Sequence, residues 1–185
     1  MAYRNGTYIA FHAAGTTDPT ASDIRYYRLL KAWHEHDDID FTFINSHDKA
    51  ASVRDSSKKA TLMESLRQRL NNSKNMVLIL GQTTKYDTDW VPFEIEHAVD
   101  RCRIPLIVTY TDYSSICDPA ALSMLWPTAL SGRIAAQTVK AVHVPFKQQI
   151  LDDAIRRFNL TSLPDGSLVH YTREGHRRFG VDVPF

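Results

Sequence analysis

The feature that most constrains the fold is an alternation of short apolar runs with amphipathic stretches. The runs lie at residues 7–11, 40–44, 76–80, 105–110 and 139–144, and the clearest is Met76-Val77-Leu78-Ile79-Leu80. A run that is apolar at nearly every position is typical of a strand buried on both faces of a parallel sheet. Strands of this kind are joined by crossover helices, so the alternation predicts an α/β protein.

The stretches between these runs have the periodicity of helices. Helices are expected over residues 23–36, 57–72, 89–101, 120–125 and 146–158, and in the second of them Leu62, Leu66 and Leu70 recur every four residues. Five strands, each followed by a helix, predict a flavodoxin-like five-stranded parallel sheet in the order 2-1-3-4-5. Helices should cover both of its faces.

Length and charge limit the classes of protein to consider. The chain has 185 residues, with 22 Lys and Arg against 21 Asp and Glu. Such a balance argues against a dedicated nucleic-acid binder, which usually carries a basic surplus. We expect a domain over residues 1–160 and a C-terminal extension over 161–185 packed on it. Residues 167–172 are a candidate short strand.

The sequence also bears on location. No apolar run approaches the roughly 20 residues that a membrane-spanning helix needs, and the N-terminus lacks the pattern of a secretory signal. The two cysteines, Cys102 and Cys117, form no Cys-x-x-Cys motif. A cytoplasmic protein that engages neither membrane nor nucleic acid is the simplest expectation.

Ligands of an open parallel sheet bind beyond the carboxyl ends of its strands, which nominates the loops at 11–17, 45–56 and 81–89. The first loop is small and polar, as in some flavin-binding proteins, but the standard dinucleotide and P-loop motifs are absent. A receiver domain would need an acidic pair where this chain has Phe11 and His12. His34 and His36 are two residues apart on a helix and do not converge on a metal, so we expect no metal site.

The most informative stretch is residues 80–95, a polar loop that leads into a helix. Trp90 and Glu94 are four residues apart and therefore share one helix face, whereas Glu96 is rotated away from them. The first turns of a helix favour an ionised carboxylate such as that of Glu94.

This stretch closely resembles the TIR-domain family, whose members carry a polar loop with Tyr and then Trp-x-x-x-Glu. The resemblance covers about 150 residues in element order. It includes first and second strands at 8–12 and 41–45 and a long polar segment at 46–57 that matches the family's BB loop. Residues 89–95 are its most specific part. Within the family, the chain looks most like the stand-alone TIR-like ThsB proteins of bacterial Thoeris anti-phage defence.

The resemblance implies an NAD-cleaving enzyme with Glu94 as the catalytic residue and NAD as substrate, so no separate cofactor is expected. The product would be ADP-ribose or a cyclic or conjugated derivative that activates a separate effector protein. Self-association is expected on activation. The positions implied to bind substrate are Phe11, His12, Asn45, Asp48, Gly81, Thr83 and Trp90. Lys49 or Arg54 would meet the diphosphate.

The chain departs from the family pattern at two places. Many TIR domains have an acidic residue directly after the second strand, where this chain has Asn45, with Asp48 three residues later. Many also have a basic residue after the first strand, where His12 stands here.

Two other functions remain open at this point. One is a TIR module that only self-associates or recruits partners. For the two residues themselves, the alternative roles are core packing for Trp90 and an exposed helix carboxylate for Glu94. The other is an enzyme like the nucleoside deoxyribosyltransferases, with Glu94 as nucleophile.

Overall fold

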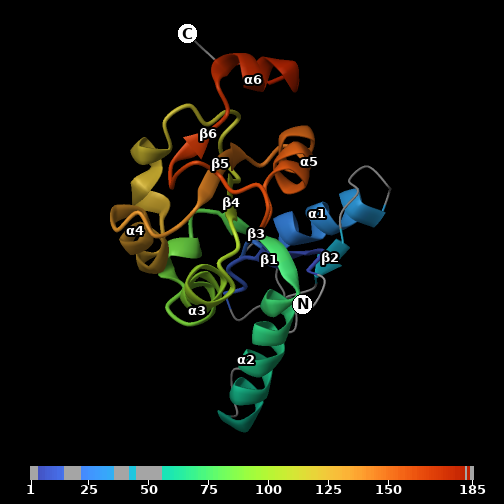
Figure 1. The fold of residues 1–185 in the computed structure, drawn as a ribbon, viewed down its shortest axis with the longest axis vertical. Coiled ribbons are helices and arrows are strands. Elements are labelled where there is room, and N and C mark those ends of the chain that lie inside the picture. The colour runs from blue at the N-terminus through green and yellow to red at the C-terminus, as the bar shows by residue number, and fades with distance from the viewer. Residues whose placement is uncertain (1–3, 15–21, 36–41, 45–55, 182, 184–185) are drawn as a thin grey trace.

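A computed structural model describes residues 4–14, 22–35, 42–44, 56–181 and 183 (Figure 1). Its centre is one sheet in which every neighbouring pair of strands is parallel, in the order β2-β1-β3-β4-β5-β6. The expected order of the first five strands is confirmed, and a short sixth strand extends the sheet. The strands are β1 Gly6–Ala10, β2 Thr42–Ile44, β3 Ser73–Leu80, β4 Leu106–Tyr110, β5 Ala141–Pro145 and β6 Val169–His170.

Helices pack on both faces of this sheet and produce two cores. One core joins the sheet to α2, α3 and α4, and the other joins it to α1 and α5. The helices are α1 Ile24–Glu35, α2 Ser56–Asn71, α3 Trp90–Glu96, α4 Thr128–Ala135, α5 Gln148–Arg157 and α6 Arg173–Arg178. In the described part of the chain, no helix combines the length and the apolar character needed to cross a membrane.

The two-sided burial explains why the strands are apolar throughout. In β3, Met76 and Leu78 point into the core beneath α2 and α3, while Val77 and Ile79 point into the core beneath α1 and α5. All four side chains are fully buried. Removing any of them would leave a cavity on one face of the sheet.

The structure corrects the expected helices in two places. The helix expected over 89–101 forms as α3, but its last part, His97–Cys102, is a π-helical segment. The helix expected at 120–125 is a 3-10 helix, Pro119–Leu125, and the unexpected α4 begins directly after Pro127. Proline stops a preceding helix but fits the start of the next one, which the pattern alone did not reveal.

The C-terminal segment is tied to the sheet by two buried histidines. His143 of β5 donates from Nε2 to the Ser167 carbonyl (2.9 Å), just before β6 pairs with β5. His176 of α6 accepts a hydrogen bond at Nε2 from the Ile116 N–H (3.2 Å), in the loop after β4. Residues beyond 160 therefore add a strand and a helix to the main fold.

The buried hydrogen-bond chain around His143 predicts a pH dependence. Trp126 Nε1 donates a hydrogen bond to Tyr110 Oη, and Tyr110 Oη donates one to His143 Nδ1. Both donor–acceptor distances are 2.8 Å. Burial lowers the pKa of His143 from 6.5 to about 4. Between these values the unfolded chain binds the proton more readily. The free energy of unfolding should therefore fall by up to about 3 kcal/mol as pH drops through this window.

Urea unfolding between pH 4 and 7 measures this effect when wild type is compared with His143→Gln. Glutamine can still donate and accept hydrogen bonds but does not titrate. The free energy of unfolding of wild type minus that of His143→Gln should rise with pH up to about 6.5 and then level off. Parallel curves for the two proteins would contradict the assignment.

Candidate functional site

The loops that follow β1 and β3 meet where the chain order of the sheet reverses. His12 follows β1 and Thr83 follows β3, and His12 Nδ1 lies 3.2 Å from Thr83 Oγ1. These expected substrate-binding residues are therefore in contact. Phe11 instead lies in the core, 1% exposed, and stacks on Tyr27 of α1 with ring centres 4.7 Å apart.

A buried carboxylate that sequence reasoning missed fastens these two loops together. The Asp23 N–H donates to the His12 carbonyl (3.1 Å), and the Thr84 hydroxyl donates to Asp23 Oδ2 (2.7 Å). Thr84 Oγ1 in turn accepts from the Gly81 N–H (2.8 Å). Burial raises the pKa of Asp23, while the bond from Thr84 and the charge of His12 lower it. Asp23 thus links the start of α1 to the ends of β1 and β3.

Gly81 leaves the space that this carboxylate occupies. A Cβ atom at position 81 would lie 2.0 Å from Asp23 Oδ1 and 2.8 Å from its Cγ. Such distances are far inside van der Waals contact, so any side chain here would displace Asp23. The sequence predicted Gly81 as a substrate-binding residue, and the structure gives it a packing role beside the loop.

Helix α3 begins where Asp87 caps it. Asp87 Oδ1 accepts from the N–H groups of Asp89 (3.0 Å) and Trp90 (2.8 Å), which satisfies amides that have no partner within the helix. Asp89 occupies the position directly before the helix, but its own side chain makes no capping hydrogen bond. The helix therefore starts at Trp90 and places Glu94 one turn further in.

Glu94 is fully buried against the sheet rather than exposed on the helix. Its side chain is 0% exposed. The Tyr8 hydroxyl of β1 donates a hydrogen bond to Glu94 Oε1 at a distance of 2.5 Å. Burial raises the pKa of Tyr8 well above its ordinary value, and the Glu94 charge raises it further. Tyr8 therefore stays protonated and donates to the carboxylate. The competing interpretation of Glu94 as a solvent-exposed carboxylate is wrong, whereas Glu96 is exposed as expected.

Trp90 forms a half-buried wall one turn before Glu94. It packs against the core shared by α2, α3 and α4. The Lys59 ammonium lies 5.6 Å from its ring centre and 3.3 Å from Asp89 Oδ2. A tryptophan in this position contributes to packing and still presents part of its ring outward.

The two parts of the site are connected through β1. Tyr8 contacts Glu94, and His12, four residues later, contacts Thr83. Four residues of extended chain span at most about 14 Å, which sets an upper limit on the Cα separation of Tyr8 and His12. Asn45, Asp48, Lys49 and Arg54 lie outside the described residues.

Sequence reasoning missed Tyr8, Asp23, Thr84 and Asp87. Tyr8 looks like any other aromatic residue of a buried strand, although a tyrosine buried at this depth needs a partner for its hydroxyl. Asp23 begins an expected helix, where an acidic residue is ordinary. Only the crossing of β1, β3 and α3 in space reveals their partners.

Removing the Tyr8 hydroxyl tests how Glu94 is held. Tyr8→Phe takes away the hydrogen bond to a buried carboxylate, so the free energy of unfolding should fall by about 1–3 kcal/mol. Tyr86→Phe is the matched control, because Tyr86 is 68% exposed and should lose almost nothing. Urea unfolding measures both. Equal stability of the two variants would show that Tyr8 contributes nothing through its hydroxyl.

Adding one methyl group at position 81 tests whether Asp23 holds the two loops together through its hydrogen bond with Thr84. Gly81→Ala forces Asp23 away from Thr84 and should lower the free energy of unfolding by about 1–3 kcal/mol, with faster hydrogen exchange at the amide of residue 81. Gly132→Ala in α4 is the control, since a Cβ there meets no atom within 4 Å. Alanine is the better helix former, so the control should gain up to about 1 kcal/mol. A Gly81→Ala variant with unchanged stability and exchange would refute the fastening role.

Comparison with known families agrees with this geometry. A family model described as Thoeris protein ThsB, TIR-like domain, matches residues 8–116. That span is more than half of the 185-residue chain and runs from β1 past β4. It contains Tyr8, Asp23, Thr84, Trp90 and Glu94. The chain therefore belongs to the family of TIR-like domains of the Thoeris protein ThsB.

Proposed function

We propose that this Thoeris defence TIR module cleaves NAD, with Glu94 as the catalytic carboxylate. The observation that carries the proposal is the burial of Glu94 against β1, with the Tyr8 hydroxyl on its Oε1. An ionised carboxylate is costly to bury, and such groups concentrate at functional sites. The Trp-x-x-x-Glu spacing and the family membership support the same assignment.

The chemistry needs only one carboxylate because of the leaving group. The nicotinamide of NAD is a cationic pyridinium, and when its C–N bond to ribose breaks, the bonding electron pair stays on nicotinamide, which departs neutral. No general acid is required, unlike in most glycosidases. Glu94 would hold the ribose hydroxyls and stabilise the positive charge that develops at the anomeric carbon.

The acceptor that attacks this carbon determines the product. Water yields ADP-ribose, an internal hydroxyl or ring nitrogen yields a cyclic form, and another small molecule yields a conjugate. A water or hydroxyl acceptor loses a proton as it attacks, for which Glu94 is a suitable base, whereas a ring nitrogen attacks through its lone pair and has no proton to lose. The product would then act as a signal that a separate effector protein binds during anti-phage defence.

Other side chains would orient the substrate. Trp90 would wall the nicotinamide side, and His12 and Thr83 would line the loop edge. Asn45 and Asp48, with Lys49 or Arg54 at the diphosphate, complete the proposed contacts.

The shielding of Glu94 adds a requirement to the mechanism. A carboxylate that is 0% exposed cannot contact a substrate until the residues that cover it move. Conformational steps of this kind gate many enzymes. We propose that self-association drives this step, so specific activity should rise with protein concentration.

The same shielding is also what a purely structural carboxylate would show, and it favours one second candidate. In a non-catalytic interaction module, Glu94 would only join α3 to β1 through Tyr8. The two functions differ in what they predict for a substitution that keeps this hydrogen bond and removes the charge.

Glu94→Gln is that substitution, because the glutamine carbonyl can still accept from Tyr8. Concentrated wild-type protein incubated with NAD should release nicotinamide, and Glu94→Gln should lower the rate by about 100-fold or more. Glu96→Gln, an exposed neighbour on the same helix, should change it less than about twofold. Liquid chromatography with mass spectrometry measures nicotinamide and identifies the nucleotide product.

Two results would overturn the proposal. Equal rates for Glu94→Gln and wild type would remove Glu94 from catalysis. No release by wild type at any concentration, or in phage-infected cells, would favour the interaction module. A parallel incubation with deoxynucleosides tests the deoxyribosyltransferase alternative, in which these rather than NAD are consumed.

A further inference from the structure

A pocket lies at the other end of the fold, between α5, β5 and the C-terminal segment. Its volume is about 390 Å³, within the range of small-molecule sites. Residues 169–179, which include β6 and α6, supply most of its wall, and β5 and α5 supply the rest. These parts lie outside the span that matches the family model.

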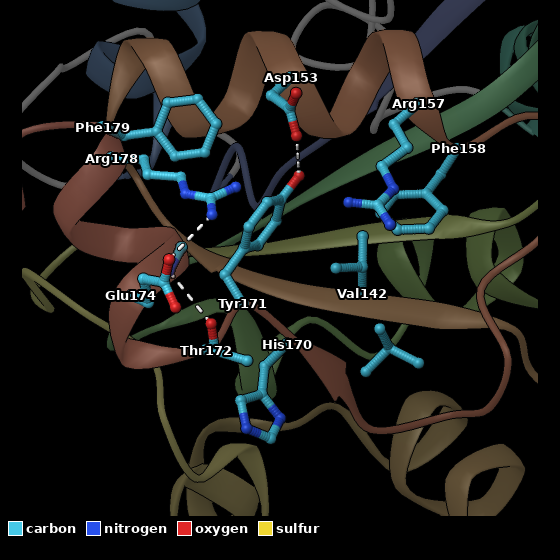
Figure 2. A pocket seen from close by; sticks show the side chains of 12 residues that line it. Val142, Asp153, Arg157, Phe158, His170, Tyr171, Thr172, Glu174, Arg178 and Phe179 are labelled. Carbon is cyan, nitrogen blue, oxygen red and sulfur yellow. Dashed lines mark hydrogen bonds and ion pairs between the residues drawn. The ribbon is translucent and has the colours of Figure 1, made fainter.

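The two carboxylates of the pocket are already engaged. The Tyr171 hydroxyl donates a hydrogen bond to Asp153 Oδ2. Glu174 Oε1 accepts one from Arg178 at a distance of 2.8 Å (Figure 2). Burial raises the pKa of Tyr171, the Asp153 carboxylate raises it further, and Arg157 lowers it. The positive charge of Arg157 therefore acts on the Tyr171–Asp153 pair.

Arg157 is the cation of this pocket that lacks a carboxylate partner. Its guanidinium lies 5.3 Å from the ring centre of Phe158, and within the described residues no carboxylate oxygen comes within 4.0 Å of it. The adjacent Arg156 differs, since its Nε lies 2.8 Å from Asp152 Oδ1. A guanidinium at the edge of a pocket, with its donors available, is suited to a phosphate or carboxylate.

Aromatic and apolar side chains form part of the remaining wall, beside His170 and Thr172. Tyr171 and Phe179 are half-buried, with ring centres 5.8 Å apart and planes at 82°. Figure 2 shows Tyr171 between Arg157 on one side and Arg178 and Phe179 on the other. Val142 and Val169 also line the pocket. Partly open aromatic faces of this kind stack on planar rings.

We propose that this pocket binds a small planar anion of the nucleoside monophosphate type. The phosphate would lie at Arg157 and the ring against Tyr171 or Phe179. The proposal rests on the C-terminal pocket alone and does not depend on NAD cleavage at Glu94. It makes the C-terminal segment a ligand-binding element.

Isothermal titration calorimetry of the full chain with AMP tests the proposal. Adenosine, which lacks the phosphate, and inorganic phosphate, which lacks the ring, should each bind more weakly than AMP. Arg157→Gln should lower the affinity for AMP by about tenfold or more and leave the affinity for adenosine unchanged. Arg156→Gln, on the same helix but already paired with Asp152, should change AMP affinity less than about twofold.

Two further measurements distinguish AMP binding at this pocket from binding near Glu94. Glu94→Gln should leave AMP binding at the C-terminal pocket intact, and chemical shift changes should centre on the amides of 153–158 and 169–179. Undetectable AMP binding at millimolar concentration would overturn the proposal. So would binding that is equal in Arg157→Gln and wild type, or that is lost in Glu94→Gln. Thermal unfolding of each variant checks that it is folded.

Discussion

The hydrogen bond from Tyr8 to Glu94 is the interaction on which the candidate site depends. It joins the buried strand β1 to α3 and places a carboxylate in the core, where an unpaired charge would be strongly destabilising. The Tyr8 hydroxyl stays protonated because burial and the neighbouring charge both raise its pKa. A carboxylate held in this way is pre-positioned, which is the property that electrostatic stabilisation of a developing positive charge requires.

Around this contact, the parallel sheet determines which loops can cooperate. The ends of β1 and β3 are neighbours, and Asp23 bonds to His12 on one side and Thr84 on the other. The absent side chain of Gly81 makes room for that carboxylate. The loop that leads into α3 is thus anchored at Thr84, and Asp87 then starts the helix that carries Trp90 and Glu94. The positions of these residues follow from a few buried polar contacts at one edge of the sheet.

Much of this fold is predictable from the sequence because both faces of the sheet are buried. Continuous apolar runs identified β1, β3 and β4 within a few residues, and helical spacing identified α1, α2 and α5. The spacing of Trp90 and Glu94 identified the candidate catalytic helix. What the sequence did not reveal depends on partners distant along the chain. The Tyr8–Glu94 bond spans 86 residues and the Asp23–Thr84 bond spans 61, so no local pattern signals either one.

Local signals failed where one residue type serves two roles. Proline commonly ends a helix, and Pro127 also occupies the cap position directly before α4. Aspartate commonly caps a helix, yet the N–H groups of Asp89 and Trp90 bond to Asp87 rather than to the side chain of Asp89 at the cap position. Gly81, which the resemblance implies to bind substrate, also leaves the space that Asp23 needs, and no local pattern signals this packing role.

The most direct test of the central claim is a crystal structure of the chain with an NAD analogue whose glycosidic bond cannot be cleaved. If Glu94 is the catalytic carboxylate, the nicotinamide ribose should lie within hydrogen-bonding distance of it, with Trp90 beside the nicotinamide ring and the residues that cover Glu94 displaced. An analogue bound elsewhere, with Glu94 still enclosed against Tyr8, would contradict that role.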